Sequence, residues 1–308
     1  MSEVSELKTI RDLIRWAVSR FQEANLYFGH GTETAWDEAF ALILHSLHLP
    51  HTMDPSFLDA RLTVNEREKL HRLIQTRIDE RIPVPYLTHE AWFAGLPFYV
   101  DERVLIPRSP LAESIANNFA PWIDIETVGS ILDLCTGSGC IAIACALAYP
   151  GCSVDASDIN EEALAVAKMN VLRHQVEDQV TLIHSDLFSA IPHKKYDLII
   201  SNPPYVDAED MADLPAEYRH EPKLALAAGG DGLDVVTRIL RDALPYLSDN
   251  GTLIVEVGNS EFALAEKYPM IPFIWLEFQN GGGGIFLLSA ADLKKAQAEL
   301  TDESQHVR

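Results

Sequence analysis

The sequence predicts an α/β fold: a mostly parallel, doubly wound sheet of seven strands, preceded by a small helical domain and a linking β-hairpin. Two observations carry this prediction. In residues 1–88, apolar positions recur three and four residues apart, which is the period of amphipathic helices. From residue 111 onward, short apolar runs alternate with helical segments of about 10–15 residues, a pattern typical of parallel strands joined by crossover helices.

The helical domain is expected over residues 1–88, and we assign it to substrate recognition because it carries no catalytic signature. One apolar stripe runs through residues 7–21 and a second through residues 36–47. A third helix is expected to begin at a capping box, in which the side chains of Thr63 and Glu66 each accept a hydrogen bond from the other's backbone N–H.

Residues 89–110 are expected to form the hairpin linker, because aromatic and β-branched residues alternate on either side of Asp101-Glu102. Residues 111–290 are expected to form the sheet domain, and residues 291–308 a polar tail that frays. The expected strands are 130–134, 153–158, 179–184, 196–200, 252–257, 273–278 and 284–289.

The chain carries a formal net charge of −22, which argues against a protein that binds nucleic acid through its phosphates. Residues 1–90 hold 10 basic and 14 acidic side chains, whereas residues 91–308 hold 14 and 32, a net charge of −18. This acidic part fits a basic partner protein, although acidity also serves solubility. No apolar run is long enough to span a bilayer and the first twenty residues are rich in charge, so we expect a cytoplasmic protein with no membrane partner.

Four cysteines fall within eighteen residues, but they lack the closely spaced pairs that zinc sites use. They lie on or beside one predicted strand and the helix after it, where small buried side chains are expected. We therefore expect no metal site. The four are Cys135, Cys140, Cys145 and Cys152.

A glycine-rich turn follows the first strand of the predicted sheet and opens a helix. Glycines let the backbone fold sharply and let a ligand approach with no Cβ in the way. Asp158 ends the next strand, where a carboxylate can accept hydrogen bonds from ribose hydroxyls. The turn by itself also fits a dinucleotide-binding fingerprint. Its residues are Cys135, Thr136, Gly137, Ser138 and Gly139.

Three features favour S-adenosylmethionine over NAD as the cofactor. Asp133 ends the first strand, where a carboxylate suits a cationic amino-acid group and would repel a pyrophosphate. Cys135 stands where a dinucleotide-binding turn usually has its first glycine. Asp186, with Leu187 after it, closes the third strand and offers an acceptor for an adenine amino group.

The tetrapeptide Asn202-Pro203-Pro204-Tyr205 follows an apolar strand and is therefore expected at the carboxyl end of the sheet, where doubly wound folds bind ligands. An amide nitrogen is a poor nucleophile because its lone pair is delocalised. Hydrogen bonds from its two N–H groups to the Asn202 side-chain oxygen and the Pro203 carbonyl favour pyramidalisation, and the Tyr205 ring offers a face for stacking. We expect methyl transfer to a planar, non-basic nitrogen, which includes amides and the exocyclic amino groups of adenine and cytosine.

With these residues in view, the chain resembles the HemK-like protein-glutamine methyltransferases over nearly its whole length. The resemblance is carried by GLPFYVDERVLIPRSP in the hairpin region, DLCTGSG, NPPY, and EPKLALAAGGDGL at 221–233. It implies a Rossmann-like class I methyltransferase domain that uses S-adenosylmethionine. It also implies that the glycine turn, Asp158 and the tetrapeptide contact the cofactor or the target amide. Asn202 is expected to contact both.

Two motifs separate the branches of this family. Arg108 is followed by Ser109-Pro110, where the release-factor branch usually has proline, glutamate and threonine. The last hairpin has the sequence FQNGGGGIFLL in place of an arginine-containing motif. Both departures resemble the PrmB-type branch, which methylates a glutamine of the third protein of the large ribosomal subunit. The resemblance therefore implies a basic ribosomal protein as the partner, and no sequence-specific nucleic acid.

Three alternatives stay open. The first is a release-factor glutamine methyltransferase, and the second is a nucleic-acid amino-methyltransferase, which the acidity of the chain disfavours. The third is a non-catalytic ribosome-assembly factor that only binds the cofactor. An NAD oxidoreductase would leave the tetrapeptide without a role.

The segment after the tetrapeptide, residues 206–231, carries seven acidic side chains against one arginine and one lysine. Loops at this edge of a sheet commonly contact the substrate. We expect the segment to form a mobile acidic lid over the target amide.

Overall fold

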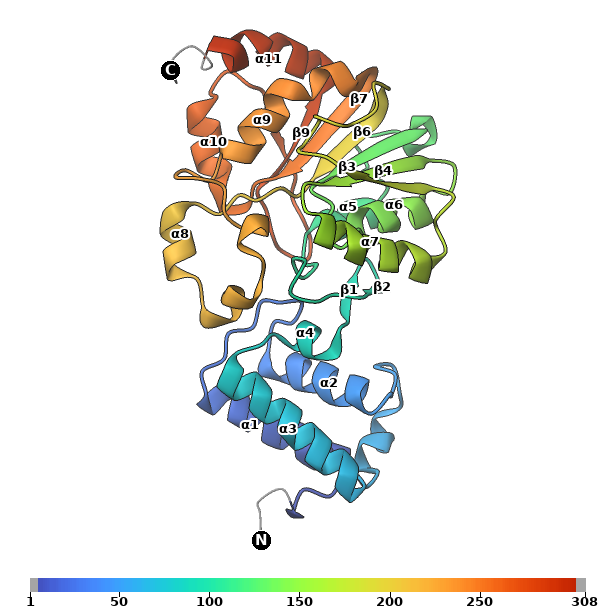
Figure 1. Cartoon of the computed structure of the whole chain (residues 1–308), viewed down its shortest axis with the longest axis vertical. Helices are drawn as coiled ribbons and strands as arrows, with labels where there is room; N and C mark the ends of the chain where they lie inside the picture. Colours follow the sequence, from blue (N-terminus) through green and yellow to red (C-terminus); the bar gives the residue numbers. More distant parts are fainter. Residues whose placement is uncertain (1–4, 303–308) are drawn as a thin grey trace. The chain divides into compact units, whose positions relative to one another are not determined.

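The computed structural model describes residues 5–302, and packing divides the chain into two compact units (Figure 1). The helical unit contains the residues up to Ala91 together with Val100–Glu102 and Pro215–His220. The sheet unit contains Trp92–Tyr99, Arg103–Leu214 and the residues from Glu221 onward. The sequence did not lead us to expect Pro215–His220 in the helical unit, because this segment follows the tetrapeptide.

Three helices of the helical unit begin at a threonine capping box. The box expected at Thr63 and Glu66 is confirmed, with the Thr63 N–H donating to Glu66 and the Glu66 N–H to Thr63. Leu13, Phe21 and Leu42 are fully buried in the core that these helices share. The helices are α1 (Ile10–Glu23), α2 (Ala35–Ser46), α3 (Val64–Glu80) and α4 (Val84–Thr88), with the 3-10 helices η2 (Pro55–Asp59) and η4 (Ala216–His220).

The main sheet has seven strands within the described residues, in the order β5-β4-β3-β6-β7-β9-β8. Neighbours from β5 to β7 are parallel, whereas β9 is antiparallel to both β7 and β8. The mostly parallel sheet expected from the sequence is confirmed, although β7 begins five residues before the expected 252. The strands are β3 (Ser130–Leu134), β4 (Ser153–Asp158), β5 (Val180–His184), β6 (Tyr196–Ser201), β7 (Leu247–Glu256), β8 (Ile274–Trp275) and β9 (Ile285–Ser289).

Helices cover both faces of this sheet, as a doubly wound fold requires (Figure 1). On β3, Ile131 packs in the core shared with α5, α6 and α7, and Leu132 in the core shared with α9, α10 and α11. Alternate residues of a strand face opposite sides, which explains this division. The helices of the sheet unit are α5 (Leu111–Ala116), α6 (Cys140–Ala148), α7 (Glu161–His174), α8 (Ala208–Asp213), α9 (Asp234–Asp242), α10 (Glu261–Lys267) and α11 (Ala290–Asp302). Of these, α8 buries no residue and does not cover the sheet. The 3-10 helices are η3 (Ile125–Thr127), η5 (Lys223–Ala225), η6 (Leu244–Tyr246) and η7 (Gly258–Ser260).

Two properties of these helices bear on the sequence-based expectations. The cysteines of α6 and its flanks are free thiols; Cys140, Cys145 and Cys152 are buried and Cys135 is half-buried. Among residues 5–302, no helix is both long and apolar enough to cross a membrane.

The linking hairpin forms, but its turn lies at Ala94-Gly95 and not at Asp101-Glu102 as expected. Strands β1 (Ala91–Phe93) and β2 (Leu96–Phe98) pair on either side of this turn. Both turn residues have positive φ, 50° for Ala94 and 76° for Gly95, which matches the twist of a tight two-residue hairpin. Asp101 is buried, so it could not have served as an exposed turn residue.

The expectation of a fraying tail after Ala290 is wrong for the residues that the structure describes. The chain continues as α11 to Asp302. Leu293, Ala296 and Leu300 recur every three or four residues and are buried against the core of the α9 face. Polar residues between them hid this stripe in the sequence. Residues 303–308 lie outside the described residues.

Candidate active site

A cavity opens at the carboxyl ends of β3, β4, β5 and β6 in the sheet unit. It lies where the strand order reverses between β3 and β6, the place at which doubly wound sheets bind ligands. Residues from all four strand ends contribute to its wall, as the sequence predicts. These are Cys135, Gly137, Asp158, Asp186, Leu187, Asn202 and Pro204.

The glycine turn has the conformation that its composition predicts. Gly137 and Gly139 have positive φ, 55° and 81°. A Cβ on Gly139 would lie 3.3 Å from the Cβ of Ala167, whereas a Cβ on Gly137 would meet no protein atom within 4 Å. Because Gly137 lines the cavity, a substituent-free Cα leaves that space open for a ligand. Cys135 also has positive φ, 59°, which explains why a glycine commonly occupies this position.

Asp158 is held at the cavity wall by backbone N–H groups. Its Oδ2 accepts from the Gly137 N–H at 2.9 Å, and its Oδ1 accepts from the Asn160 N–H at 2.9 Å. Burial raises the pKa of this carboxyl, and the two N–H donors oppose the shift. Each carboxylate oxygen keeps acceptor capacity, so Asp158 can take further hydrogen bonds from a pair of hydroxyls.

Asp133 lies behind the turn and is not among the residues that line the cavity. It is fully buried, and its Oδ2 accepts from the Thr136 hydroxyl at 2.5 Å and the Ala142 N–H at 3.2 Å. Burial raises the pKa of Asp133 to about 7. These two contacts place Asp133 against the turn, in which Thr136 and Ser138 are also buried. A direct contact of Asp133 with a cationic group stays a prediction.

Asp186 reaches the cavity in partnership with an arginine that the sequence did not indicate. Its Oδ1 accepts from Arg238 of α9 at 2.8 Å. Both side chains are about half exposed, so the pair adds little to stability. Leu187 follows in a left-handed conformation with φ 48° and is buried at the wall. No sequence pattern near Arg238 could have identified this long-range partner.

The tetrapeptide leaves β6 and stays out of the sheet ladder. Ser201, just before it, donates its hydroxyl to the Leu134 carbonyl at 2.9 Å, which fixes the end of β6 to the end of β3. Asn202 and Pro204 line the cavity, and Pro203 is buried. Tyr205 is not among the lining residues.

Tyr205 is held at three points within the sheet unit. Its carbonyl accepts from the Ser260 hydroxyl at 2.8 Å, and its own hydroxyl donates to Glu256 at 3.2 Å. Its ring lies against Gly258, where a Cβ would come within 2.5 Å of a ring carbon. The ring position therefore depends on a glycine at 258 and on the carboxylate of Glu256.

Glu256 is a site residue that the sequence analysis missed. It ends β7, next to β6, and is only 5% exposed. Its Oε1 accepts from Tyr205, and its Oε2 accepts a very short hydrogen bond from the Ser109 hydroxyl. Burial raises its pKa, and the hydrogen bonds from Ser109 and Tyr205, together with the nearby positive charge of Arg108, oppose the shift. An acid at the end of an apolar strand is the same signal that identified Asp158, so the sequence did contain a pointer to Glu256.

Two of the seven acidic residues of the segment 206–231 are buried. Glu221 is buried and accepts from Arg108 at 2.6 Å and from the Ile106 N–H at 3.0 Å. Glu217 is buried in the helical unit. The segment also supplies Pro222, Leu224, Ala225 and Ala227 to the cavity wall. Its role as a mobile lid stays a prediction, with Glu209, Asp210 and Asp213 exposed.

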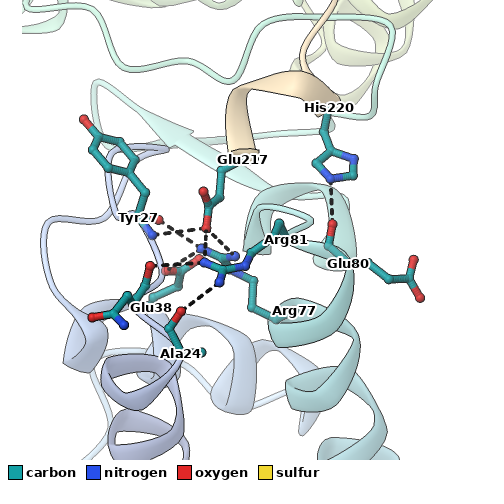
Figure 2. Close-up of polar contacts among 9 residues, drawn as sticks. Ala24, Tyr27, Glu38, Arg77, Glu80, Arg81, Glu217 and His220 are labelled. Atoms are coloured by element: carbon teal, nitrogen blue, oxygen red, sulfur yellow. Dashed lines mark hydrogen bonds and ion pairs between the residues drawn. The ribbon is translucent and has the colours of Figure 1, made fainter. Parts of the chain in front are cut away.

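Glu217 belongs to a buried ion-pair network of the helical unit (Figure 2). Arg77, with no exposed surface, donates to Glu38 at 2.8 Å and to Glu217 at 3.3 Å. It also donates to the Tyr27 carbonyl at 3.0 Å, while the Tyr27 N–H donates to Glu217 at 3.1 Å. The network fixes the segment Pro215–His220 on α2 and α3.

Comparison with known proteins decides the family. The protein-family model described as "Methyltransferase small domain" matches residues 116–231 of the sequence. The ribosomal protein uL3 glutamine methyltransferase of Francisella tularensis is 50% identical over 293 residues, which cover 95% of this chain and 93% of that protein. The protein of the same name from Burkholderia pseudomallei is 49% identical over 295 residues, covering 93% and 96%. The chain belongs to the HemK-like protein-glutamine methyltransferase family.

The resemblance stated from the motifs is thus confirmed, and the chain is a methyltransferase whose cofactor is S-adenosylmethionine. The cavity fits that cofactor, because Gly137 leaves room at the wall and Asp158 offers acceptors for ribose hydroxyls. When bound, the cofactor supplies an electrophilic methyl group on a sulfonium. A solved structure, the hMettl16 catalytic domain with MAT2A 3′UTR hairpin 6, has a TM-score of 0.49 and 18% identity over 74% of this chain and 81% of that one, too distant to bear on function.

Proposed function

We propose that this enzyme transfers a methyl group from S-adenosylmethionine to the side-chain amide nitrogen of a glutamine in ribosomal protein uL3, the third protein of the large subunit. One observation carries the proposal. The tetrapeptide Asn202–Tyr205 borders the cavity at the carboxyl end of β6, in a chain half identical to two uL3 glutamine methyltransferases. The site residues proposed for catalysis are Asn202, Pro203, Pro204 and Tyr205.

In this proposal the chain's own groups make the amide reactive by accepting its two hydrogens. The Asn202 side-chain oxygen and the Pro203 carbonyl take one N–H each, which favours a pyramidal nitrogen whose lone pair points along the transfer axis. Alignment of nitrogen and methyl contributes about 7–11 kcal/mol in well-oriented systems. No strong base is required, because the alkylated amide loses its proton readily to water.

The charge of the enzyme supports a basic protein as the partner. Residues 91–308 carry a net charge of −18, and Glu209, Asp210 and Asp213 of α8 are exposed next to the tetrapeptide in sequence. Such a surface attracts a basic protein and repels a phosphate backbone. We therefore propose no nucleic-acid or membrane partner, and a cytoplasmic site of action where ribosomal proteins are made.

The test supplies labelled S-adenosylmethionine with purified uL3, a release factor or a structured RNA, followed by mass spectrometry of the labelled product. We expect label on one glutamine of uL3. Label on the release factor, or on an adenine or cytosine, would replace the proposal with the corresponding alternative. Cofactor binding without turnover on any substrate would indicate an assembly factor.

A further inference from the structure

Arg238 of α9 is a charged residue at the wall of the cofactor cavity whose presence the packing of the fold does not explain. The buried residues of α9, Val236, Ile239 and Leu240, pack in the core of the sheet unit. Val235 and Arg238 are three residues apart, which places them on one face of the helix, and both line the cavity. Helix α9 therefore presents an edge to the cavity, and Arg238 supplies the charge on that edge.

The backbone at Asp186 is fixed, so the position of its carboxylate depends on the side chain. The Asp186 carbonyl accepts from the Ser189 N–H at 3.1 Å. The Ser185 hydroxyl donates to the Leu187 carbonyl at 2.7 Å, which spans Asp186 from either side. Arg238 donates from Nη2 to Asp186 Oδ1 at 2.8 Å. This contact engages Oδ1, so Oδ2 keeps the capacity to accept a hydrogen bond from a ligand in the cavity.

A second ion pair on the same helix provides a comparison for this one. Arg241 donates to both oxygens of Asp242 at 2.8 Å, and the two side chains are 42% and 41% exposed. Arg238 and Asp186 are 42% and 45% exposed. Pairs as exposed as these contribute little to stability, so stability accounts for neither. The two pairs differ in place, because Arg238 and Asp186 line the cavity whereas Arg241 and Asp242 are not among its lining residues.

The cofactor carries a group that suits the second oxygen of Asp186. The 6-amino group of adenine is an N–H donor, and a hydrogen bond from it is strong only when the acceptor is held at a favourable angle. Bound adenosine also removes water from the ion pair, which strengthens the attraction between guanidinium and carboxylate. A carboxylate that is already held in one rotamer adds no ordering cost when the adenine binds.

We propose that Arg238 is a positioning residue for the cofactor, because it holds the Asp186 carboxylate so that Oδ2 faces the adenine amino group and thereby sets the preference for adenine. Arg238 acts through Asp186 and does not itself contact the cofactor. The proposal rests on Asp186 as the acceptor of the adenine amino group. It concerns cofactor binding and does not depend on which protein the enzyme methylates.

The test measures, by calorimetry, the binding of S-adenosylhomocysteine and of an analogue in which hydrogen replaces the 6-amino group of its adenine. The wild type should bind the analogue at least ~10-fold more weakly, because Asp186 is left without a donor. Arg238→Met keeps the length of the side chain but removes the donor to Asp186. It should weaken binding of S-adenosylhomocysteine about 5- to 10-fold and of the analogue less than about twofold. Arg241→Met is the matched control and should leave both affinities unchanged.

A double-mutant cycle separates positioning from direct contact. Asp186→Ala should weaken binding of S-adenosylhomocysteine, and Asp186→Ala combined with Arg238→Met should weaken it no further. Additive losses would overturn the proposal, since Arg238 would then contact the cofactor itself. It would also be overturned if Arg238→Met weakened both ligands equally or neither of them, or if the wild type bound the two ligands equally well. None of these measurements uses a methyl acceptor, so a failure to methylate uL3 would refute the proposed function alone.

Discussion

The helical unit and the sheet unit each bury two glutamates, and Glu217 of the first and Glu256 of the second are held by different kinds of donor. Glu217 accepts from the guanidinium of Arg77 and from the Tyr27 N–H, with Arg81 at 3.5 Å. Burial alone would raise the pKa of Glu217, but these donors bring it below its ordinary value. Glu217 is thus held ionised at neutral pH.

Glu256, in contrast, accepts from the hydroxyls of Ser109 and Tyr205, and burial dominates to raise its pKa. The comparison separates two uses of a buried acid. A carboxylate paired with arginine fixes one segment to another, and its loss leaves a buried cation short of a partner. A carboxylate held by hydroxyls keeps more of its desolvation cost, and Glu256 lies beside the tetrapeptide through its contact with Tyr205.

Glu217→Gln tests whether the buried ion pair stabilises the fold, and it should have the largest effect on stability. Removing one partner of a buried ion pair typically costs about 3–5 kcal/mol. We expect a loss of this size in the free energy of unfolding, measured by urea denaturation. Glu209→Gln, an exposed change in α8 of the same segment, is the control and should cost less than ~0.5 kcal/mol. A loss below ~1 kcal/mol for Glu217→Gln would show that the network does not anchor Pro215–His220.

Asp158 extends the comparison to a second acid held by uncharged donors. If its oxygens accept ribose hydroxyls, Asp158→Ala should weaken binding of S-adenosylmethionine by about 1–3 kcal/mol. Isothermal calorimetry measures this directly, and the same titration of the wild type with NAD should give no heat. An unchanged affinity would remove Asp158 from the cofactor site.

Tyr205→Phe tests the contact between Glu256 and the tetrapeptide from the other side. The ring survives for stacking, but Glu256 loses the donor on its Oε1. Leaving a buried acceptor short of one donor costs about 1–3 kcal/mol, so we expect kcat to fall on the order of tenfold. Steady-state kinetics with a folded variant checks this. A Phe variant as active as the wild type would mean that the Tyr205 hydroxyl has no part in positioning.

The pH dependence of stability should have opposite signs for the two glutamates. Glu217 has a lowered pKa when folded, so it stabilises the wild type above about pH 4.3 and loses that effect as the pH falls through its folded value. The deficit of Glu217→Gln should therefore shrink in acid. Glu256 has a raised pKa when folded, so the wild type loses stability as the pH rises from about 4.3 through the folded value. Glu256→Gln should therefore gain on the wild type as the pH rises. Urea unfolding between about pH 4 and 8 measures both, and slopes of the same sign would contradict the comparison.

Features that depend on neighbours along the chain could be predicted from the sequence. The strand ends at Asp158 and Asn202 and the glycine turn follow from apolar periodicity and from the conformational needs of glycine. Because the strands are parallel, their carboxyl ends meet at the same edge of the sheet, so the sequence also predicts that these residues lie together. The cavity wall was therefore largely predictable.

Features that depend on partners far apart in sequence were missed. Arg77 and Glu217 are 140 residues apart, and Ser109 and Glu256 are 147 apart, so no local pattern connects either pair. Asp133 is a different case: it accepts from Thr136, only three residues away, and its contact with a cationic group stays a prediction. The stripe of α11 was missed because its polar residues outnumber the buried ones.

The central claim is that Asn202 orients a glutamine amide of uL3 for methyl transfer, and single-turnover methylation of purified uL3 tests it most directly. With enzyme in excess, Asn202→Ala should slow the chemical step by at least ~100-fold, in line with the loss of one preorganised polar contact at a reacting centre. Asn202→Asp should be similarly slow, because it adds a charge that the neutral amide does not need. Binding of S-adenosylmethionine and the thermal melt should stay near those of the wild type. An Asn202→Ala variant that methylates the same glutamine at close to the wild-type rate would contradict the account.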